Sequence, residues 1–204
     1  MKALWSTLRE VRGNKNVWLF LLAYWLYIDG VVTIIKMGVD YGLSIGLSSN
    51  SLIVALLIVQ FVGFPATLLF GRIAENFRAV HALWAALWIY VFATAYAYFM
   101  QSTTDFYLLA VVLGLVQGGV QSISRSLFSQ LIPVQKSGEY FGLFNMTGKA
   151  AAVFGPTLVG TVALVSEDSR LGFLSIVVLF LAGMLVLRSV RAECKCTGTN
   201  SLVT

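Results

Sequence analysis

Six hydrophobic stretches, each long enough to cross a lipid bilayer as a helix, fill most of this chain of 204 residues. The hydrocarbon core of a bilayer takes roughly 20 apolar helical residues to cross. Charged residues make up only 11% of the chain, against about 25% in an ordinary soluble domain. The sequence therefore predicts an all-α membrane protein with six transmembrane helices, at about residues 17–39, 50–71, 79–99, 104–131, 138–165 and 170–188.

The basic residues outside these stretches lie almost entirely on one side of the predicted membrane. Cytoplasmic loops of membrane proteins carry an excess of Lys and Arg. With both termini in the cytoplasm, Arg170 is the one basic residue outside the cell, so an N-in/C-in orientation is predicted. This bias accounts for the net charge of +5, and no nucleic-acid partner is inferred from it. The inside residues are Lys2, Arg9, Arg12, Lys15, Arg72, Arg78, Lys136, Arg188, Arg191 and Lys195.

Three segments follow from this pattern. Residues 1–16 are predicted to form a cytoplasmic N-terminal segment, residues 17–191 the six-helix transmembrane domain, and residues 192–204 a disordered cytoplasmic tail. Cys194 and Cys196 in the tail and the single histidine, His81, do not supply the four ligands of a structural metal site. We therefore expect no metal and no cofactor.

Polar side chains distinguish some of the six stretches from the others. Residues 79–99 and 170–188 are plainly apolar and are expected to form peripheral helices. A charged side chain at the centre of a membrane helix costs about 2.5–3.5 kcal/mol, so each one in the remaining stretches needs a compensating reason. These stretches carry Asp29 and Lys36, Gln60, Gln117, Gln121 and Arg125, and Asn145 and Lys149.

Depth and helical face group these residues. Asp29, Gln117 and Lys149 are predicted near the membrane midplane, whereas Lys36 and Arg125 lie nearer helix ends. Helical spacing puts Gln117, Gln121, Ser124 and Arg125 on one stripe, and Asn145 and Lys149 on one face. Such a set forms either a structural network between helices or the lining of a solute pathway, which we favour. Asp29 has three options: to pair with Lys149, to bind a substrate amine or to carry a proton.

Proline and glycine add a second signal. Pro65 and Pro156 lie inside predicted spans, where each removes a backbone hydrogen bond and favours a kink. The segments Phe64–Gly71 and Gly155–Gly160 are weakly similar around these prolines. Spans one and four carry polar stripes, two and five carry prolines, and three and six are plain. This alternation indicates a three-plus-three repeat, as in many transporters.

Several motifs resemble one transporter family. The run Ala23–Ile35, which contains Asp29 and Gly30, resembles the seventh helix of the "unknown major facilitator" group, which includes autophagy-related vacuolar amino-acid effluxers. The family's helices ten and eleven are similar to a longer run: Gln117-Gly118-Gly119, Ser124-Arg125-Ser126, Leu131-Ile132-Pro133, Glu139-Tyr140-Phe141-Gly142, Asn145, Gly148-Lys149 and Gly155-Pro156. A weaker match, Gly71-Arg72-Ile73-Ala74-Glu75, is similar to the general major-facilitator loop motif.

The resemblance covers about residues 15–191 and implies the C-terminal half of a twelve-helix major-facilitator fold. It implies secondary transport of small solutes, with amino acids as the substrate class. Because the cavity of such transporters lies between two halves, it also implies a partner, either a second copy or a separate N-terminal half. The residues carried over to the pathway are Asp29, Gln117, Arg125, Asn145 and Lys149. Gly30, Gly118 and Gly119 are expected to allow close helix packing or bending.

Two other classes compete with a transporter. One is a membrane scaffold, or an inactive half-transporter, in which the polar residues serve assembly alone. The other is an intramembrane serine hydrolase, because Gly42-Leu43-Ser44-Ile45-Gly46 fits Gly-x-Ser-x-Gly. That motif needs a strand–turn–helix setting and a histidine, whereas Ser44 is predicted in an external loop and His81 near the cytoplasm, so we expect no enzyme. The short loops favour a prokaryotic inner membrane as the location, with lipid as the surrounding partner.

Overall fold

The computed structural model describes residues 10–76 and 79–190, without the side chains of residues 69–76 and Val134. The tail 192–204, with Cys194 and Cys196, lies outside the described residues, as do Lys2, Arg9, Arg78, Arg191 and Lys195. The described chain is almost entirely helical. Its elements are α2 (Lys15–Ser44), α3 (Ser49–Asn76), α4 (Ala79–Phe99), α5 (Thr103–Leu131), the short helix η1 (Val134–Lys136), α6 (Ser137–Ala150), α7 (Phe154–Ser166), α8 (Ser169–Leu174) and α9 (Ile176–Arg188).

Six segments of this structure are long and apolar enough to cross a membrane, which confirms the number of spans. Their bounds differ from the prediction at the ends. α2 continues to Ser44, so the first span is longer than residues 17–39. The fifth span consists of two helices, α6 and α7, separated by a turn at residues 151–153, and the sixth consists of α8 and α9. α5 begins with a capping box between Ser102 and Asp105, which satisfies two backbone N–H groups at its start.

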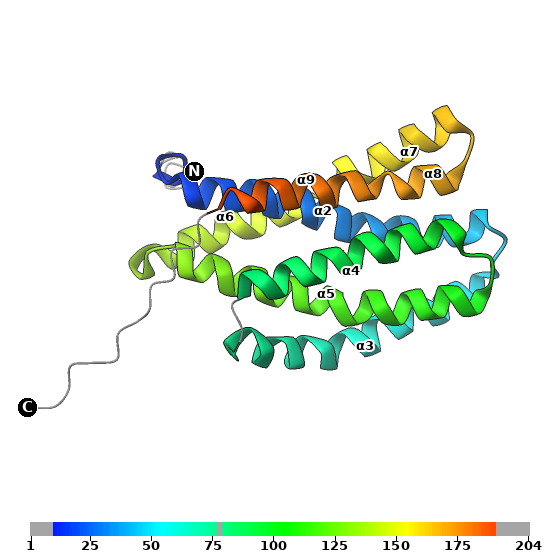
Figure 1. The fold of residues 1–204 in the computed structure, drawn as a ribbon, viewed down its shortest axis with the longest axis horizontal. Helices are drawn as coiled ribbons and strands as arrows, with labels where there is room; N and C mark the ends of the chain where they lie inside the picture. The colour runs from blue at the N-terminus through cyan, green and yellow to red at the C-terminus, as the bar shows by residue number, and fades with distance from the viewer. Residues whose placement is uncertain (1–9, 77–78, 191–204) are drawn as a thin grey trace, which may run out of the picture.

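The helices pack in two groups that run side by side (Figure 1). α5 packs against α3 and α4, whereas α2 packs most extensively against α9 and also against α6 and α7. In terms of spans, the fourth therefore joins the second and third, and the first joins the fifth and sixth. The chain thus consists of two triplets of spans, one to three and four to six, and the first span of each triplet packs against the second and third spans of the other. It agrees with the predicted three-plus-three half of a major-facilitator fold.

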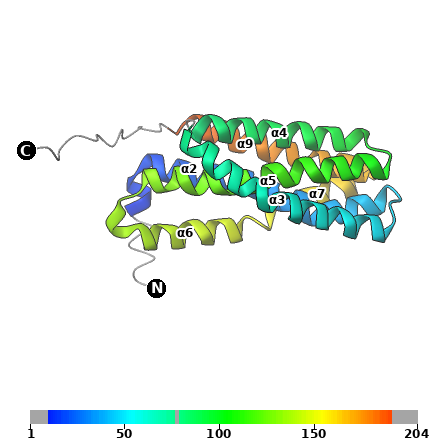
Figure 2. The same cartoon turned by 90° about the horizontal axis from the view of Figure 1, so that it is seen from below.

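The core lies where α2 meets α5, α6 and α9. Phe20 of α2 stacks on Phe128 of α5, and Phe128 stacks on Phe144 of α6. Tyr24 packs on the same Phe144, with ring centroids 4.0 Å apart. Flat rings carry much apolar area, so a short row of them joins three helices without a large cavity. This row of rings holds α6 against the other helices. Figure 2 shows α6 at the edge of the bundle.

The prediction that the two plain spans are peripheral is wrong for this six-helix unit. The least buried spans are the second and the fifth, that is α3 and α6 with α7. α4 buries Leu83 and Leu87, and α9 buries Ile176 and Phe180. A plain apolar helix packs equally well against protein or lipid, because both surroundings are apolar. Composition alone therefore does not distinguish the two.

Candidate functional site

The polar stripe of α5 faces the open side of the bundle. Gln121 and Arg125 are exposed and Gln117 is half-buried. Ser124, predicted on the same stripe, is instead fully buried. Its hydroxyl donates to the carbonyl of Val120 at 2.6 Å, so it accepts from the hydroxyl of Tyr27 at 2.7 Å. Ser124 therefore joins α5 to α2, and the accessible part of the stripe consists of Gln117, Gln121 and Arg125.

The polar residues of α6 are exposed as well. Asn145 and Lys149 both face outward, while Gly148, next to Lys149, lies against the hydroxyl of Tyr24 on α2. Lys149 belongs to the last turn of α6. A positive charge there stabilises the helix, because the carbonyl groups of its end carry partial negative charge. Lys149 thus has a local structural role besides the pathway role that we predict for it.

The two charged residues of α2 that the sequence assigns to the pathway differ in their surroundings. Lys36 is exposed, whereas Asp29 is only 2% exposed. Asp29 forms no ion pair with Lys149; across residues 10–76 and 79–190 the ion pair found joins Lys136 to Glu10, outside the spans. Of the three options for Asp29, pairing with Lys149 is therefore not what this structure contains.

The turn between α6 and α7 lies over Asp29. The backbone N–H of Gly155, in the first turn of α7, faces the carboxyl group of Asp29. A Cβ atom at Gly155 would lie 2.8 Å from the Cβ of Thr33 and 3.2 Å from the backbone oxygen of Asp29. Only glycine allows α7 this close to α2. Two buried oxygen atoms beneath it, Oδ1 of Asp29 and Oγ1 of Thr33, have no hydrogen-bond partner.

The other predicted kink and packing residues lie in two settings. Gly118 of α5 faces Thr67 and the carbonyl of Gly63 on α3, and its neighbour Gly119 is buried. Gly30 of α2 lies against the ring of Phe180: a Cβ atom added at Gly30 would lie 3.0 Å from the Cζ atom of Phe180. The prolines differ: Pro65 lies within the continuous helix α3, whereas Pro156 lies in the first turn of α7, after the break.

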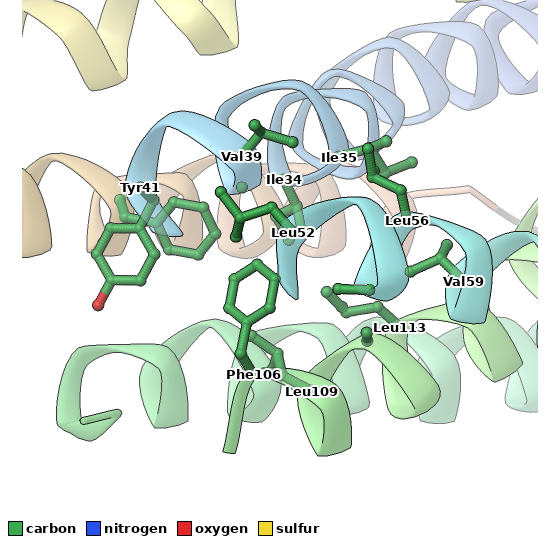
Figure 3. Close-up of a pocket in the computed structure, with 14 residues that line it drawn as sticks. Ile34, Ile35, Val39, Tyr41, Leu52, Leu56, Val59, Phe106, Leu109 and Leu113 are labelled. Carbon is green, nitrogen blue, oxygen red and sulfur yellow. The ribbon is translucent and has the colours of Figure 1, made fainter. Parts of the chain in front are cut away.

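An apolar pocket of about 50 Å³, which the sequence did not suggest, lies between α2, α3 and α5 (Figure 3). Its labelled side chains are hydrocarbon except for the hydroxyl of Tyr41. Small-molecule sites occupy about 300–1,000 Å³ and contain converging polar groups. This pocket has neither property, so it belongs to the packing between helices.

A wider groove of about 400 Å³ lies between α2 and α6. Trp18, Leu22 and Trp25 of α2 form one wall, and Leu143 and Thr147 of α6 form the other. Its walls are apolar and open, as expected of a surface that lipid or another helix covers. None of the predicted pathway residues lines it.

The serine of the Gly-x-Ser-x-Gly pattern is not in a catalytic setting. Ser44 is the last residue of α2 rather than part of a loop, and its hydroxyl donates to the carbonyl of Tyr41 at 2.7 Å. His81 lies at the start of α4. No group of three or more metal-ligating side chains occurs among the residues that the structure describes.

The architecture and the polar helices define this chain as a multi-pass membrane protein built as half of a major-facilitator fold. Comparison with known proteins gives the family. The chain belongs to the family described as vacuole effluxer Atg22 like, whose model matches residues 1–197. This confirms the resemblance seen in the sequence, and it points to a transporter rather than an enzyme.

Relatives occur in bacteria and in fungi. The chain is 39% identical over 192 residues to the Bacillus subtilis protein named uncharacterized MFS-type transporter YxiO, covering 94% of this chain and 45% of the relative. It is 32% identical over 192 residues to autophagy-related protein 22 of Yarrowia lipolytica, covering 88% and 32%. The match to the Cryptococcus neoformans protein of the same name is 28% over 202 residues, covering 91% and 35%. The chain thus spans 32–45% of these relatives' length.

Proposed function

We propose that this chain supplies the C-terminal half of a secondary transporter that moves small solutes, with amino acids as the substrate class. The observation that carries the proposal is the exposure of Gln121, Arg125, Asn145 and Lys149 on membrane-spanning helices. Such groups are costly against lipid, and in transporters they face protein or a water-filled cavity. The names of the relatives support the same function.

A complete cavity requires a second six-helix unit. We propose that this unit is a second copy of the chain or a separate N-terminal half, and that it covers α3, α6 and α7. These are the least buried helices, and α6 carries two of the exposed polar residues. A scaffold without transport would use the same surface for assembly alone. The two functions differ in whether solute crosses the membrane.

The pathway residues in this proposal are Asp29, Lys36, Gln117, Gln121, Arg125, Asn145 and Lys149. The basic and amide groups among them suit the carboxylate group of a solute such as an amino acid. An ion or proton gradient is the proposed energy source, since the sequence carries no phosphate-binding loop. We place the protein in a prokaryotic cell membrane with both termini in the cytoplasm, in line with the distribution of basic residues.

The first test is the mass of the gently solubilised complex, corrected for detergent, with identification of every chain in it. We expect the chain together with a second six-helix unit. The complex is then reconstituted into vesicles and amino-acid flux is measured. Lys149→Gln and Asn145→Ala should abolish flux at unchanged protein levels, while Met146→Ala, an exposed neighbour on α6, should not. Assembly without flux for any of the twenty amino acids would favour the scaffold.

A further inference from the structure

Asp29 lies in a closed site that contains more hydrogen-bonding capacity than it uses. Asp29 is 2% exposed and Thr33 is completely buried. The N–H of Gly155 faces the carboxyl group, yet Oδ1 of Asp29 and Oγ1 of Thr33 have no hydrogen-bond partner. Buried polar atoms are nearly always paired, so two unpaired oxygens on adjacent turns of one helix need an explanation.

The charges around Asp29 do not neutralise it. Lys36, two turns along α2, is the cation whose charge acts on this carboxyl group, and its own side chain is exposed. α7 contains no acidic, basic or histidine residue. Across the side chains that the structure describes, the other charged groups on α2 and the helices packed against it are exposed, half-buried or bound elsewhere: Lys15 and Asp40 on α2, His81 on α4, Asp105 and Arg125 on α5, Glu139 and Lys149 on α6, Arg170 on α8 and Arg188 on α9. The buried titratable groups there are tyrosines, Tyr24, Tyr27 and Tyr41 on α2, Tyr90 on α4 and Tyr140 on α6, which are neutral at physiological pH. An ionised carboxylate in this position would be buried without a paired cation, which is costly.

A solute amine is a poor occupant of this site. Neither of the two pockets described above is lined by Asp29 or Thr33, and neither is a third pocket between α2, α7 and α8. The first turn of α7 lies so close to α2 that even a methyl group at Gly155 would collide with Thr33. The occupant that needs no cavity is a proton. A neutral carboxyl group has both an O–H donor and acceptor oxygens, which is the complement that a hydroxyl group such as that of Thr33 can use.

We propose that Asp29, with Thr33 and the Gly155 amide, is a proton-binding site that must be loaded for α7 to lie against α2. The step is the addition of one proton to the carboxylate, which gives a neutral carboxylic acid. Loss of that proton leaves a charge under α7, and water reaches it only if α7 moves away. In this proposal α7 pivots at the turn of residues 151–153, which separates it from α6. As the coupling site of a transporter this rests on the proposed function, but proton binding itself is measurable without transport.

The direct test is infrared spectroscopy of the full chain in lipid discs across mildly acidic to mildly alkaline pH. We expect the C=O stretch of a protonated carboxylic acid at low pH, its disappearance as the pH rises, and its absence from Asp29→Asn. The matched control is Asp40→Asn, an exposed carboxylate on the same helix, which should retain the band. A band that persists in Asp29→Asn, or no protonated carboxyl signal at any pH, would overturn the proposal.

A second measurement follows the position of α7. Cys194 and Cys196 are first replaced by Ser, and Val159→Cys, a buried position on α7, is labelled with a maleimide. Because the thiol itself reacts faster at high pH, its rate is divided by that of exposed Ser44→Cys. We expect the ratio to rise at least several-fold with pH, and to stay low in Asp29→Asn, whose amide has the shape of the neutral acid. A ratio independent of pH with Asp29 present contradicts the proposal.

Failure of this inference and failure of the transport proposal are distinguishable. Titration of Asp29 without solute flux leaves the proton site standing and removes the transporter. Solute flux that responds to a proton gradient equally well in Asp29→Asn removes the coupling role of Asp29 and leaves the transporter. Loss of the carboxyl band together with loss of proton-driven flux in Asp29→Asn supports both.

Discussion

α3 and the α6–α7 pair both contain a proline near the middle of a membrane span, yet only one of them is broken. α3 remains a single helix through Pro65 and packs along α5. In the fifth span α6 ends at Ala150 and α7 begins at Phe154, just before Pro156. The comparison teaches that proline permits a break in a membrane helix, while the neighbouring helix decides whether the break occurs.

The neighbours of the two spans differ in what they contact. Along α3, the backbone of Val59 and Gly63 lies against Gly114 and Gly118 of α5, so small residues hold two continuous backbones together. Thr67 also donates to the carbonyl of Gly63 at 2.8 Å. Under α7 the contact is a polar one, from Gly155 to Asp29 and Thr33 of α2. A break frees backbone N–H groups, and a buried carboxyl group is a suitable acceptor for one of them.

The largest expected effect is at the broken span. Gly155→Val places a branched side chain where Thr33 and the backbone of Asp29 already lie, so α7 has to move away from α2. We expect a loss of at least about 3 kcal/mol in the free energy of unfolding, measured by denaturant titration in detergent. Thr33→Ala combined with Gly155→Ala should recover only part of the stability that Gly155→Ala alone loses, because the Cβ at position 33 would still lie 2.8 Å from the added one. If the double variant is as unstable as the single, Thr33 is not the obstacle.

The continuous span gives a smaller effect of the same kind. In Gly114→Ala the added Cβ would lie 3.0 Å from the carbonyl oxygen of Val59, and neither backbone yields easily. We expect a destabilisation of about 1–3 kcal/mol. Gly142→Ala is the control, because nothing lies within 4 Å of its added Cβ, and there the higher helix propensity of alanine should be neutral or slightly stabilising. Equal losses at both positions would mean that α3–α5 contact is not the cause.

The prolines themselves provide a third test. Pro65→Ala restores a backbone N–H inside a continuous helix, so we expect a gain of about 0.5–1.5 kcal/mol. Pro156→Ala restores one in the first turn of α7, where N–H groups have no intrahelical acceptor, so we expect almost no gain. Hydrogen exchange should show slower exchange in the turn before Pro65 and no change at residues 151–153. A continuous helix through residues 150–154 in Pro156→Ala would assign the break to proline alone.

The smallest effect is expected outside the membrane, where Lys136 donates to Glu10 at 2.8 Å. The hydrogen bond to Glu10, together with the charge of that carboxylate, raises the pKa of Lys136. A raised lysine pKa contributes stability that is present at neutral pH and lost as strongly alkaline pH neutralises the amine. Both side chains are about half exposed, so Glu10→Gln should change thermal stability only slightly, and less in high salt. A large shift in the melting temperature would contradict this view of the pair.

The sequence was sufficient for the architecture because membrane spans are long, apolar and separated by short polar loops. Each backbone polar group in a bilayer has to be satisfied within its own helix, so length and hydropathy predict spans well. The three-plus-three alternation was visible in the sequence because polar residues and prolines stand out within apolar spans. The burial of each helix could not be predicted from the sequence. α4 and α9 are as apolar as lipid-facing helices, but they are more buried than α3 and α7.

Asp29 and Lys36 show where prediction from sequence ends. Their spacing of about two turns puts both on one face of α2, and the sequence determined that this face carries charge inside the membrane. Only the tertiary structure decided that Asp29 is buried under the first turn of α7 while Lys36 stays exposed. The physical reason is that the break before α7 depends on contacts between α2 and α7, which lie far apart in the sequence. The helical period of α2 shows which residues share a face, but it does not show which part of another helix packs on that face.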